Sequence, residues 1–247
     1  MIVAAHQTML APQGGPSSLD YVQDGLYYQL DGIENAGRGV HDASASVWTD
    51  LTGNGRDATF INAASGLVWQ DDAAYLYGET HDGMAKIRGL PSMTAFTFET
   101  VYRVDSHELA GRLWDSEAYQ GGYEGKRFFA MRNDLDTTSI TIANNGDLQF
   151  PIPFVSASAR TLSVMPTAYS TTVATCVYFN GAFLETKNPP TIRTPRTMTY
   201  IDVANRSNNP NRGSDMAVFA IRCYNRVLTA SEIAANYAID KARFNLP

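Results

Sequence analysis

Three Asn-Gly pairs constrain the folding of this chain most: Asn54-Gly55, Asn145-Gly146 and Asn180-Gly181. Both residues of such a pair tolerate a positive φ, so each pair predicts a tight turn between two strands. Leu26, Tyr28 and Leu30 alternate with polar or outward positions, as in a strand, and runs such as 94–104 and 216–225 are further strand candidates. The whole pattern predicts about ten to thirteen short strands, which is typical of an all-β sandwich or jelly roll.

The C-terminal segment differs, because it carries the signals of a helix. Thr229 and Glu232 have the spacing of a capping box, in which each side chain bonds to the other residue's backbone amide. Ile233, Tyr237 and Phe244 follow at helical spacing. We therefore expect a short helix over 229–244 that packs on the sandwich, within one domain that covers 21–247.

Three segments carry a family resemblance. They are Trp48-Thr-Asp50-Leu-Thr-Gly53-Asn54-Gly55-Arg-Asp57, the run 177–181 (VYFNG) and the run 221–233 (IRCYNRVLTASEI). In this order they resemble the concanavalin A-like superfamily, in its bacterial and phage laminin-G-like or pentraxin-like branch. The resemblance implies a two-sheet antiparallel jelly roll with adjacent N- and C-terminal strands. We interpret the segments as folding signatures, because Asp50 can bond to the amides of its own turn.

Residues 1–20 are rich in Gly, Pro and Ser and predict an extended arm. An arm of this composition becomes ordered only when something holds it. We expect it to dock on other virion proteins or on a second copy of the chain, which would make a homo-oligomer. The docking residues would be apolar: Met1, Ile2, Val3 and Leu10.

Charge and hydropathy argue against two classes of partner. The net charge is −6 and Lys and Arg do not cluster, so we do not expect nucleic acid binding. No segment approaches the roughly 20 apolar residues of a membrane span, and the N-terminus does not resemble a secretory signal.

Cys176 and Cys223 lie in strand-like runs and are expected to be buried free thiols, with one bridge between them as the alternative.

The sequence shows no obvious catalytic pattern. Glycosidases of this fold class carry carboxylates on alternate residues of one strand, and no such run occurs. Glu99 and Asp105 share a strand but would lie about 20 Å apart. The sequence also lacks a nucleophile elbow and an H-x-x-x-H zinc pair. We therefore expect a protein that is not an enzyme.

Two stretches have the chemistry of binding sites. The Asn-rich stretch with Asp202, Asn205 and Asn208 offers hard oxygen ligands for Ca²⁺, and an ordinary surface loop is the alternative. Trp114, Tyr119 and Tyr123 lie among polar residues and glycines, as in aromatic sugar-binding platforms. The alternative for Trp114 is a core position at the end of a strand, and we favour it.

We expect a non-enzymatic structural module of a bacteriophage virion, either a capsid decoration or a fibre protein, with some glycan adhesion. The alternative is a lectin-like, carbohydrate-binding domain of a bacterial secreted protein, located outside the cell or on its surface. Calcium-dependent glycan binding would favour that alternative.

Overall fold

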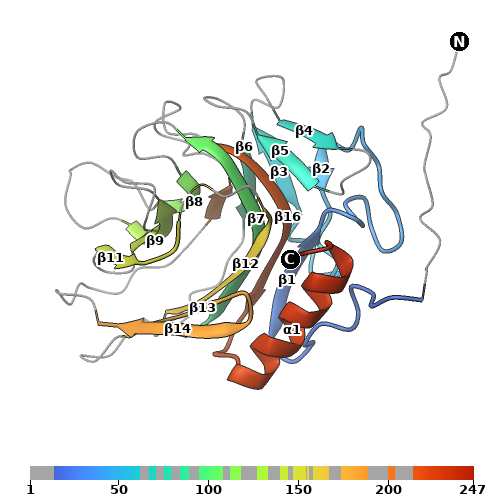
Figure 1. Ribbon diagram of the computed structural model, residues 1–247. Coiled ribbons are helices and arrows are strands. Elements are labelled where there is room, and N and C mark those ends of the chain that lie inside the picture. Colours follow the sequence, from blue (N-terminus) through green and yellow to red (C-terminus); the bar gives the residue numbers. More distant parts are fainter. Residues whose placement is uncertain are drawn as a thin grey trace, which may run out of the picture.

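The computed structural model is an all-β sandwich with one C-terminal helix (Figure 1). It describes residues 14–61, 67–70, 75–78, 84–88, 95–107, 112–117, 127–132, 140–143, 147–153, 155, 158–166, 174–188, 200–203 and 214–247. Within these ranges every strand pair is antiparallel, and the strands form two sheets of eight. The predicted all-β sandwich with a C-terminal helix is confirmed.

The first sheet has the order β14-β13-β12-β7-β16-β5-β4. Strand β1 pairs with residues 220–224 of β16, and β5 pairs with residues 216–218 of the same strand. Its strands are β1 (Leu26–Asp31), β4 (Leu67–Gln70), β5 (Tyr75–Gly78), β7 (Thr97–His107), β12 (Arg160–Pro166), β13 (Thr175–Phe179), β14 (Ala182–Lys187) and β16 (Ser214–Tyr224). The pairing of β1 with β16 places an early and a late strand side by side. That adjacency agrees with the expectation for the two ends of the domain.

The second sheet has the order β11-β10-β9-β8-β15-β6-β3-β2. Its strands are β2 (Val47–Trp48), β3 (Ala58–Ile61), β6 (Met84–Arg88), β8 (Arg112–Glu117), β9 (Arg127–Arg132), β10 (Ile140–Ala143), β11 (Asp147–Phe150) and β15 (Tyr200–Val203). The main core fills the space between the sheets, where Phe98 meets Trp114 and Trp48 meets Trp69. Alternation along β7 therefore sends Phe98 inward and its neighbours Thr97 and Glu99 to the outer face.

Residues of the segments that carry the family resemblance stabilise local turns, as expected of folding signatures. Asp50 accepts hydrogen bonds from the backbone amides of Gln29, Thr52 and Arg56, and Asp57 accepts one from the amide of Asp50. Asn180 and Gly181 have φ of 49° and 75° and connect β13 to β14. Both cysteines are free; Cys223 is buried and Cys176 is half-buried.

Helix α1 (Ala230–Arg243) covers part of the outer face of the first sheet (Figure 1). Its capping box is present as predicted: the Thr229 hydroxyl accepts from the Glu232 amide, and the Glu232 carboxylate accepts from the Thr229 amide. Ile233 packs with Met165, Tyr224 and Leu228 under the first turns. The helix therefore closes a second, smaller apolar layer.

A buried polar cluster, here called the Arg222 network, joins α1 to the sheet. The Arg222 guanidinium donates to both carboxylate oxygens of Asp240 at 2.8 and 2.7 Å, and to Glu99 at 3.1 Å. Asn236 donates to Glu99 at 2.8 Å, and Tyr21 donates to Asp240 at 2.7 Å. These side chains are almost completely buried. Desolvation raises the pKa of Glu99, although Arg222 opposes that shift.

The described part of the predicted arm lies on the body of the domain. Ser18 is buried, and its carbonyl accepts a hydrogen bond from Gln29. The Pro16 carbonyl accepts one from Arg243. Met1, Ile2, Val3 and Leu10 lie outside the described residues. The arm's docking role and the homo-oligomer therefore stay predictions.

No helix within the described ranges is long and apolar enough to cross a membrane.

Candidate ligand-binding surface

The outer face of the first sheet has two parts. The covered half lies under α1 and contains Glu99 and Arg222. The open half lies further along the same strands and comprises Tyr75, Tyr77, Arg103, Asp105, Ser106, Asp215 and Phe219. Strand register places Tyr77 opposite Ala217, and Ala217 opposite Arg103, so three neighbouring strands contribute to one row of side chains.

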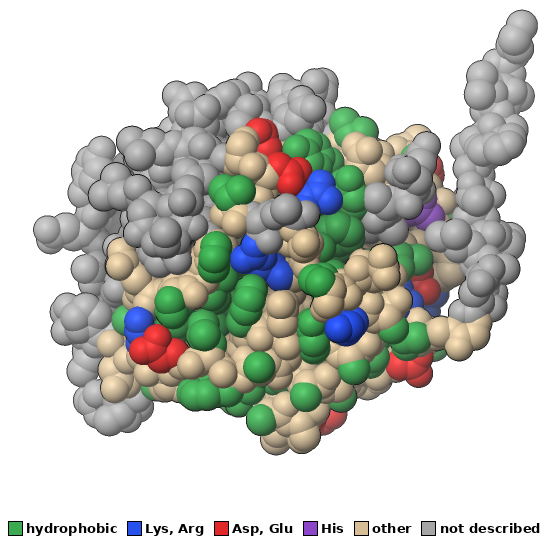
Figure 2. Space-filling view, in the orientation of Figure 1, with side chains coloured by type: hydrophobic (Ala, Val, Ile, Leu, Met, Phe, Trp, Pro, Cys, Tyr) green, Lys and Arg blue, Asp and Glu red, His purple; other side chains and the backbone are tan. Residues whose placement is uncertain are grey.

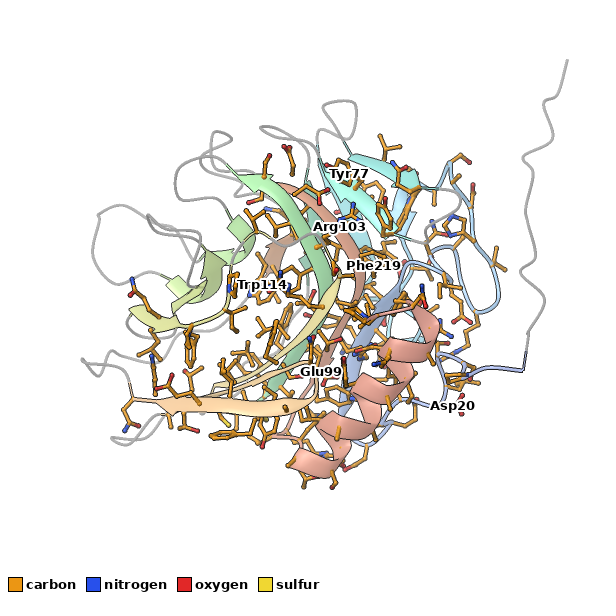
Figure 3. The ribbon with its side chains drawn as sticks, viewed as in Figure 1. Asp20, Tyr77, Glu99, Arg103, Trp114 and Phe219 are labelled. Carbon is orange, nitrogen blue, oxygen red and sulfur yellow. The ribbon has the colours of Figure 1, made fainter. Side chains whose placement is uncertain are left out.

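Aromatic rings form the floor of the open half. The ring centroid of Tyr75 lies 4.8 Å from that of Phe219 and 6.3 Å from that of Tyr77. Phe219 also meets Phe244, which caps the C-terminal end of α1, at 5.8 Å. Both tyrosines are half-buried. Figure 3 shows Tyr77, Arg103 and Phe219 on the same side of the sheet.

Charged groups border these rings. Arg103 binds Asp105 through two hydrogen bonds, Nε to Oδ1 at 2.8 Å and Nη2 to Oδ2 at 3.1 Å. The Arg103 guanidinium carbon also lies 5.4 Å from the Tyr75 ring centroid. On the neighbouring strand, Asp215 accepts a hydrogen bond from the Ser106 hydroxyl. Figure 2 shows acidic and basic side chains beside hydrophobic ones on this side of the molecule.

The ionisation of Tyr77 reflects this environment. Partial burial, followed by the negative charge of Asp105 and a hydrogen bond to it, raises the pKa of Tyr77 to about 12. The phenol is protonated at neutral pH, as an unperturbed tyrosine is, and its one O–H donates to Asp105. Together the rings, the phenol and the carboxylates can stack on an apolar face and bind hydroxyl groups at its rim.

Trp114 does not belong to this surface. It is 1 % exposed, and its ring lies between the sheets, 4.7 Å from that of Phe98 (Figure 3). This agrees with the interpretation of Trp114 as a core residue, and it leaves no ring face for a ligand. Tyr119 and Tyr123, the other two members of the predicted platform, lie outside the described residues.

The predicted calcium ligands are only partly described. Asp202 lies in β15, whereas Asn205 and Asn208 lie outside the described residues. Within the described ranges, no three His, Cys, Asp or Glu side chains gather closely enough to hold a metal ion. The calcium site therefore stays a prediction.

Strand pairing brings Asp202 next to another acidic position. In the second sheet Asp202 stands opposite Asp115 on one side and opposite Lys86 on the other. Residues directly opposite in antiparallel strands have Cβ atoms about 5 Å apart. Lys86 is only 7 % exposed, so this row is covered at that position. Sequence inspection of single strands missed this pair, because its members come from different strands.

Neither a scan of protein-family models nor a search of curated proteins finds a match to this sequence. Solved structures do resemble it. Trypanosoma rangeli sialidase, in its covalent-intermediate complex with 2,3-difluorosialic acid, gives a TM-score of 0.63 at 16% identity over 89% of this chain. Botulinum neurotoxin type C, whose cell entry depends on interaction with two ganglioside molecules, gives a TM-score of 0.61 at 9% identity over 87% of this chain. At such identities the likeness shows the fold alone.

This chain spans about a third of the sialidase chain, 33%, and about half of the neurotoxin chain, 51%. Much of each of those two chains therefore lies outside the part that this chain matches.

The expectation of a virion structural protein is wrong. The structures that resemble the chain include sialidases, which are enzymes, and a neurotoxin that interacts with gangliosides. The virion interpretation relied on the use of this fold by phages, on an N-terminus that does not resemble a secretory signal and on an ordered arm, but the same fold occurs in these glycan-related proteins.

Proposed function

We propose that this chain is a lectin-like, carbohydrate-binding domain of the concanavalin A-like jelly-roll type, and that it binds glycans on the open half. The observation that carries the proposal is the set of aromatic rings next to carboxylates. Tyr75 and Tyr77 supply half-buried rings, and the buried ring of Phe219 packs against Tyr75. Arg103, Asp105 and Asp215 supply polar groups at the border of these rings.

The chemistry of sugars explains why this arrangement suits them. A pyranose ring has an apolar face of C–H groups and a rim of hydroxyls. Aromatic side chains bury apolar area with little loss of conformational entropy, because they have only two side-chain torsions. Carboxylates accept hydrogen bonds from hydroxyls, and such charge-assisted bonds are about twice as strong as neutral ones.

The comparisons support the same class of ligand. The similar structures include a sialidase in complex with sialic acid and a neurotoxin that interacts with gangliosides, so this fold occurs in proteins that bind glycans. For this chain we propose a location outside the cell or on its surface, where such ligands occur. No virion role is proposed.

The test is glycan-array binding followed by calorimetric titration of the best glycan, with Tyr75→Ala as the diagnostic variant. Truncating an aromatic anchor of a binding site costs about 2 kcal/mol, so we expect a roughly thirtyfold loss of affinity. Phe183→Ala is the matched control, since Phe183 is an aromatic residue on β14 of the same sheet and is 58% exposed.

Unchanged affinity in Tyr75→Ala, or an equal loss in Phe183→Ala, would contradict the proposed location of the site. Adding a chelator to the same titration tests the predicted calcium site, because calcium-dependent binding would be lost.

We also propose that the chain binds glycans without cleaving them. Among the described strand pairs, Asp115 and Asp202 are the two acidic positions that stand directly opposite each other, and the buried Lys86 stands opposite Asp202 on its other side. Incubating the bound glycan with the protein and assaying for new reducing ends tests this. Turnover that disappears in Asp202→Asn would overturn it.

A further inference from the structure

We propose that Arg160 and Tyr102 form a second binding site, which takes the carboxylate group of a small organic acid. Both side chains belong to the inner face of the first sheet, whereas the open half lies on its outer face. The inference is therefore independent of the proposed function. It starts from a buried guanidinium that has no carboxylate partner among the described residues.

Strand register places the two side chains next to each other. Arg160 is the first residue of β12 and stands directly opposite Tyr102 of β7, the neighbouring strand (Figure 1). Residues directly opposite each other lie on the same face of a sheet, and Tyr102 belongs to the main core. The Arg160 guanidinium carbon lies 5.5 Å from the ring centroid of Phe179, which packs against the same core. The two polar groups therefore share aromatic surroundings between the sheets.

The Arg160 guanidinium is buried with little to neutralise its charge. The residue is 6% exposed, and its Nη1 donates to the Pro153 carbonyl at 2.8 Å. Among the residues that the structure describes, no carboxylate pairs with it, whereas the buried Arg222 binds Glu99 and Asp240. Burial lowers the pKa of Arg160. A buried charge without a counter-charge is costly, so a bound anion would stabilise this part of the molecule.

The Tyr102 hydroxyl is a second donor that is not used. Tyr102 is 0% exposed, and its hydroxyl oxygen has no hydrogen-bond partner in the described part of the chain. Buried polar groups of folded proteins nearly always have a partner, and an exception requires an explanation such as a bound ion or water. An orphan hydroxyl beside an unpaired guanidinium indicates a place for a hydrogen-bond acceptor that carries negative charge.

The chemistry of these donors selects the class of ligand. A guanidinium presents its N–H groups as a planar fork, which matches the two oxygens of a carboxylate. Arg160 carries one positive charge, so a carboxylate neutralises it, whereas a doubly charged phosphate would leave an excess charge in a buried place. The rings of Phe179 and Tyr102 offer apolar contact to the rest of the ligand. The site therefore fits a small organic acid better than an inorganic dianion.

The experiment is a calorimetric titration of the full chain with sodium propionate. Sodium chloride at equal ionic strength and inorganic phosphate are titrated for comparison. We expect propionate to bind at one site per chain, and phosphate to bind at least about tenfold more weakly because of its excess charge.

Variants locate the effect. Arg160→Met should weaken propionate binding at least about thirtyfold, and Tyr102→Phe about tenfold, since each loses a hydrogen bond to a charged acceptor. Arg56→Met is the matched control and should keep the parent affinity. Arg56 also lies over an aromatic ring, that of Tyr27 at 3.6 Å, and donates to a backbone carbonyl, but it is half-buried.

Thermal unfolding without propionate checks that the variants fold. Arg160→Met should unfold no earlier than the parent, because it removes a buried charge that has no counter-charge. If this variant does not fold, the decision falls to Tyr102→Phe, which keeps the aromatic ring.

The outcomes decide the inference in both directions. Failure of the parent to bind propionate would overturn it and would mean that water satisfies the two donors. Equal affinity in folded Arg160→Met, or unchanged affinity in Tyr102→Phe, would also overturn it. Tighter binding of phosphate than of propionate would contradict the assignment to organic acids. The glycan titrations remain a separate test, because none of these variants changes a residue of the open half.

Discussion

Strands β7 and β16 present two clusters of charged side chains on one face, and the clusters differ in how far they are exposed to solvent. In the covered half, Arg222 and Glu99 are 1% and 0% exposed and are joined to α1. In the open half, Arg103 and Asp105 are 25% and 36% exposed. The same types of group are therefore buried in one half and partly exposed in the other, because α1 covers only one of the two clusters.

The difference follows from the cost of burying charge. Removing an ion from water costs several kcal/mol, and only good geometry with further hydrogen bonds offsets that cost. The Arg222 network meets this condition, since Ser163, Asn236, Tyr21 and Thr161 complete its hydrogen bonds. Arg103 and Asp105 remain in contact with water, so their pairing costs little and they stay available to a ligand.

The largest expected effect comes from breaking the buried cluster. Arg222→Met would leave the carboxylates of Glu99 and Asp240 buried without their guanidinium, and we expect a loss of about 3–5 kcal/mol in unfolding free energy. Urea unfolding followed by tryptophan fluorescence measures it. Arg103→Met is the matched variant in the open half, where the same substitution should cost at most about 1 kcal/mol. Equal losses would remove the contrast between the two halves.

A smaller loss of unfolding free energy is expected at the N-terminus of α1, the helix that covers one half of the face. Thr229→Ala removes the hydroxyl that accepts from the Glu232 amide, and the loss of such a cap costs about 1 kcal/mol. The same urea titration detects it. Since Thr229 lies far along the helix from Phe244, glycan affinity at the open half should not change. A loss of affinity comparable to that of Tyr75→Ala would show that the two halves are coupled.

The smallest effect should depend on pH, because it comes from a carboxylate whose pKa is lowered in the folded protein. Hydrogen bonds from Arg226 and from the Thr229 amide lower the pKa of Glu232 from 4.5 to about 2. The folded protein therefore keeps this carboxylate charged at pH values where the unfolded chain takes up a proton. The stability that it contributes is complete above pH 4.5 and is lost as the pH falls toward 2.

Glu232→Gln should accordingly reduce the unfolding free energy near pH 6 more than near pH 3. Urea titrations at both values measure the change. A difference between variant and parent that does not depend on pH would contradict the assignment of this carboxylate to the cap.

The features that sequence reasoning recovered are local. The Asn180-Gly181 turn, the Asp50 loop and the capping box each depend on residues a few positions apart, because a side chain there reaches only its own or a neighbouring backbone amide. The alternation of apolar residues also predicted that strands would bury one face. The chain itself therefore determined its turns, its helix and its class as an all-β sandwich.

The candidate site required the tertiary structure. Tyr75, Arg103 and Phe219 come from three strands, and only the pairing of β5, β16 and β7 brings them together. The same holds for Glu99, Arg222 and Asp240, whose burial depends on where α1 lies. For Trp114 the sequence favoured a core position, but only the tertiary structure shows what buries it: Trp114 in the second sheet packs against Phe98 of the first. Which side chains stay exposed is decided by the packing of distant elements, and a strand's own sequence does not specify its partners.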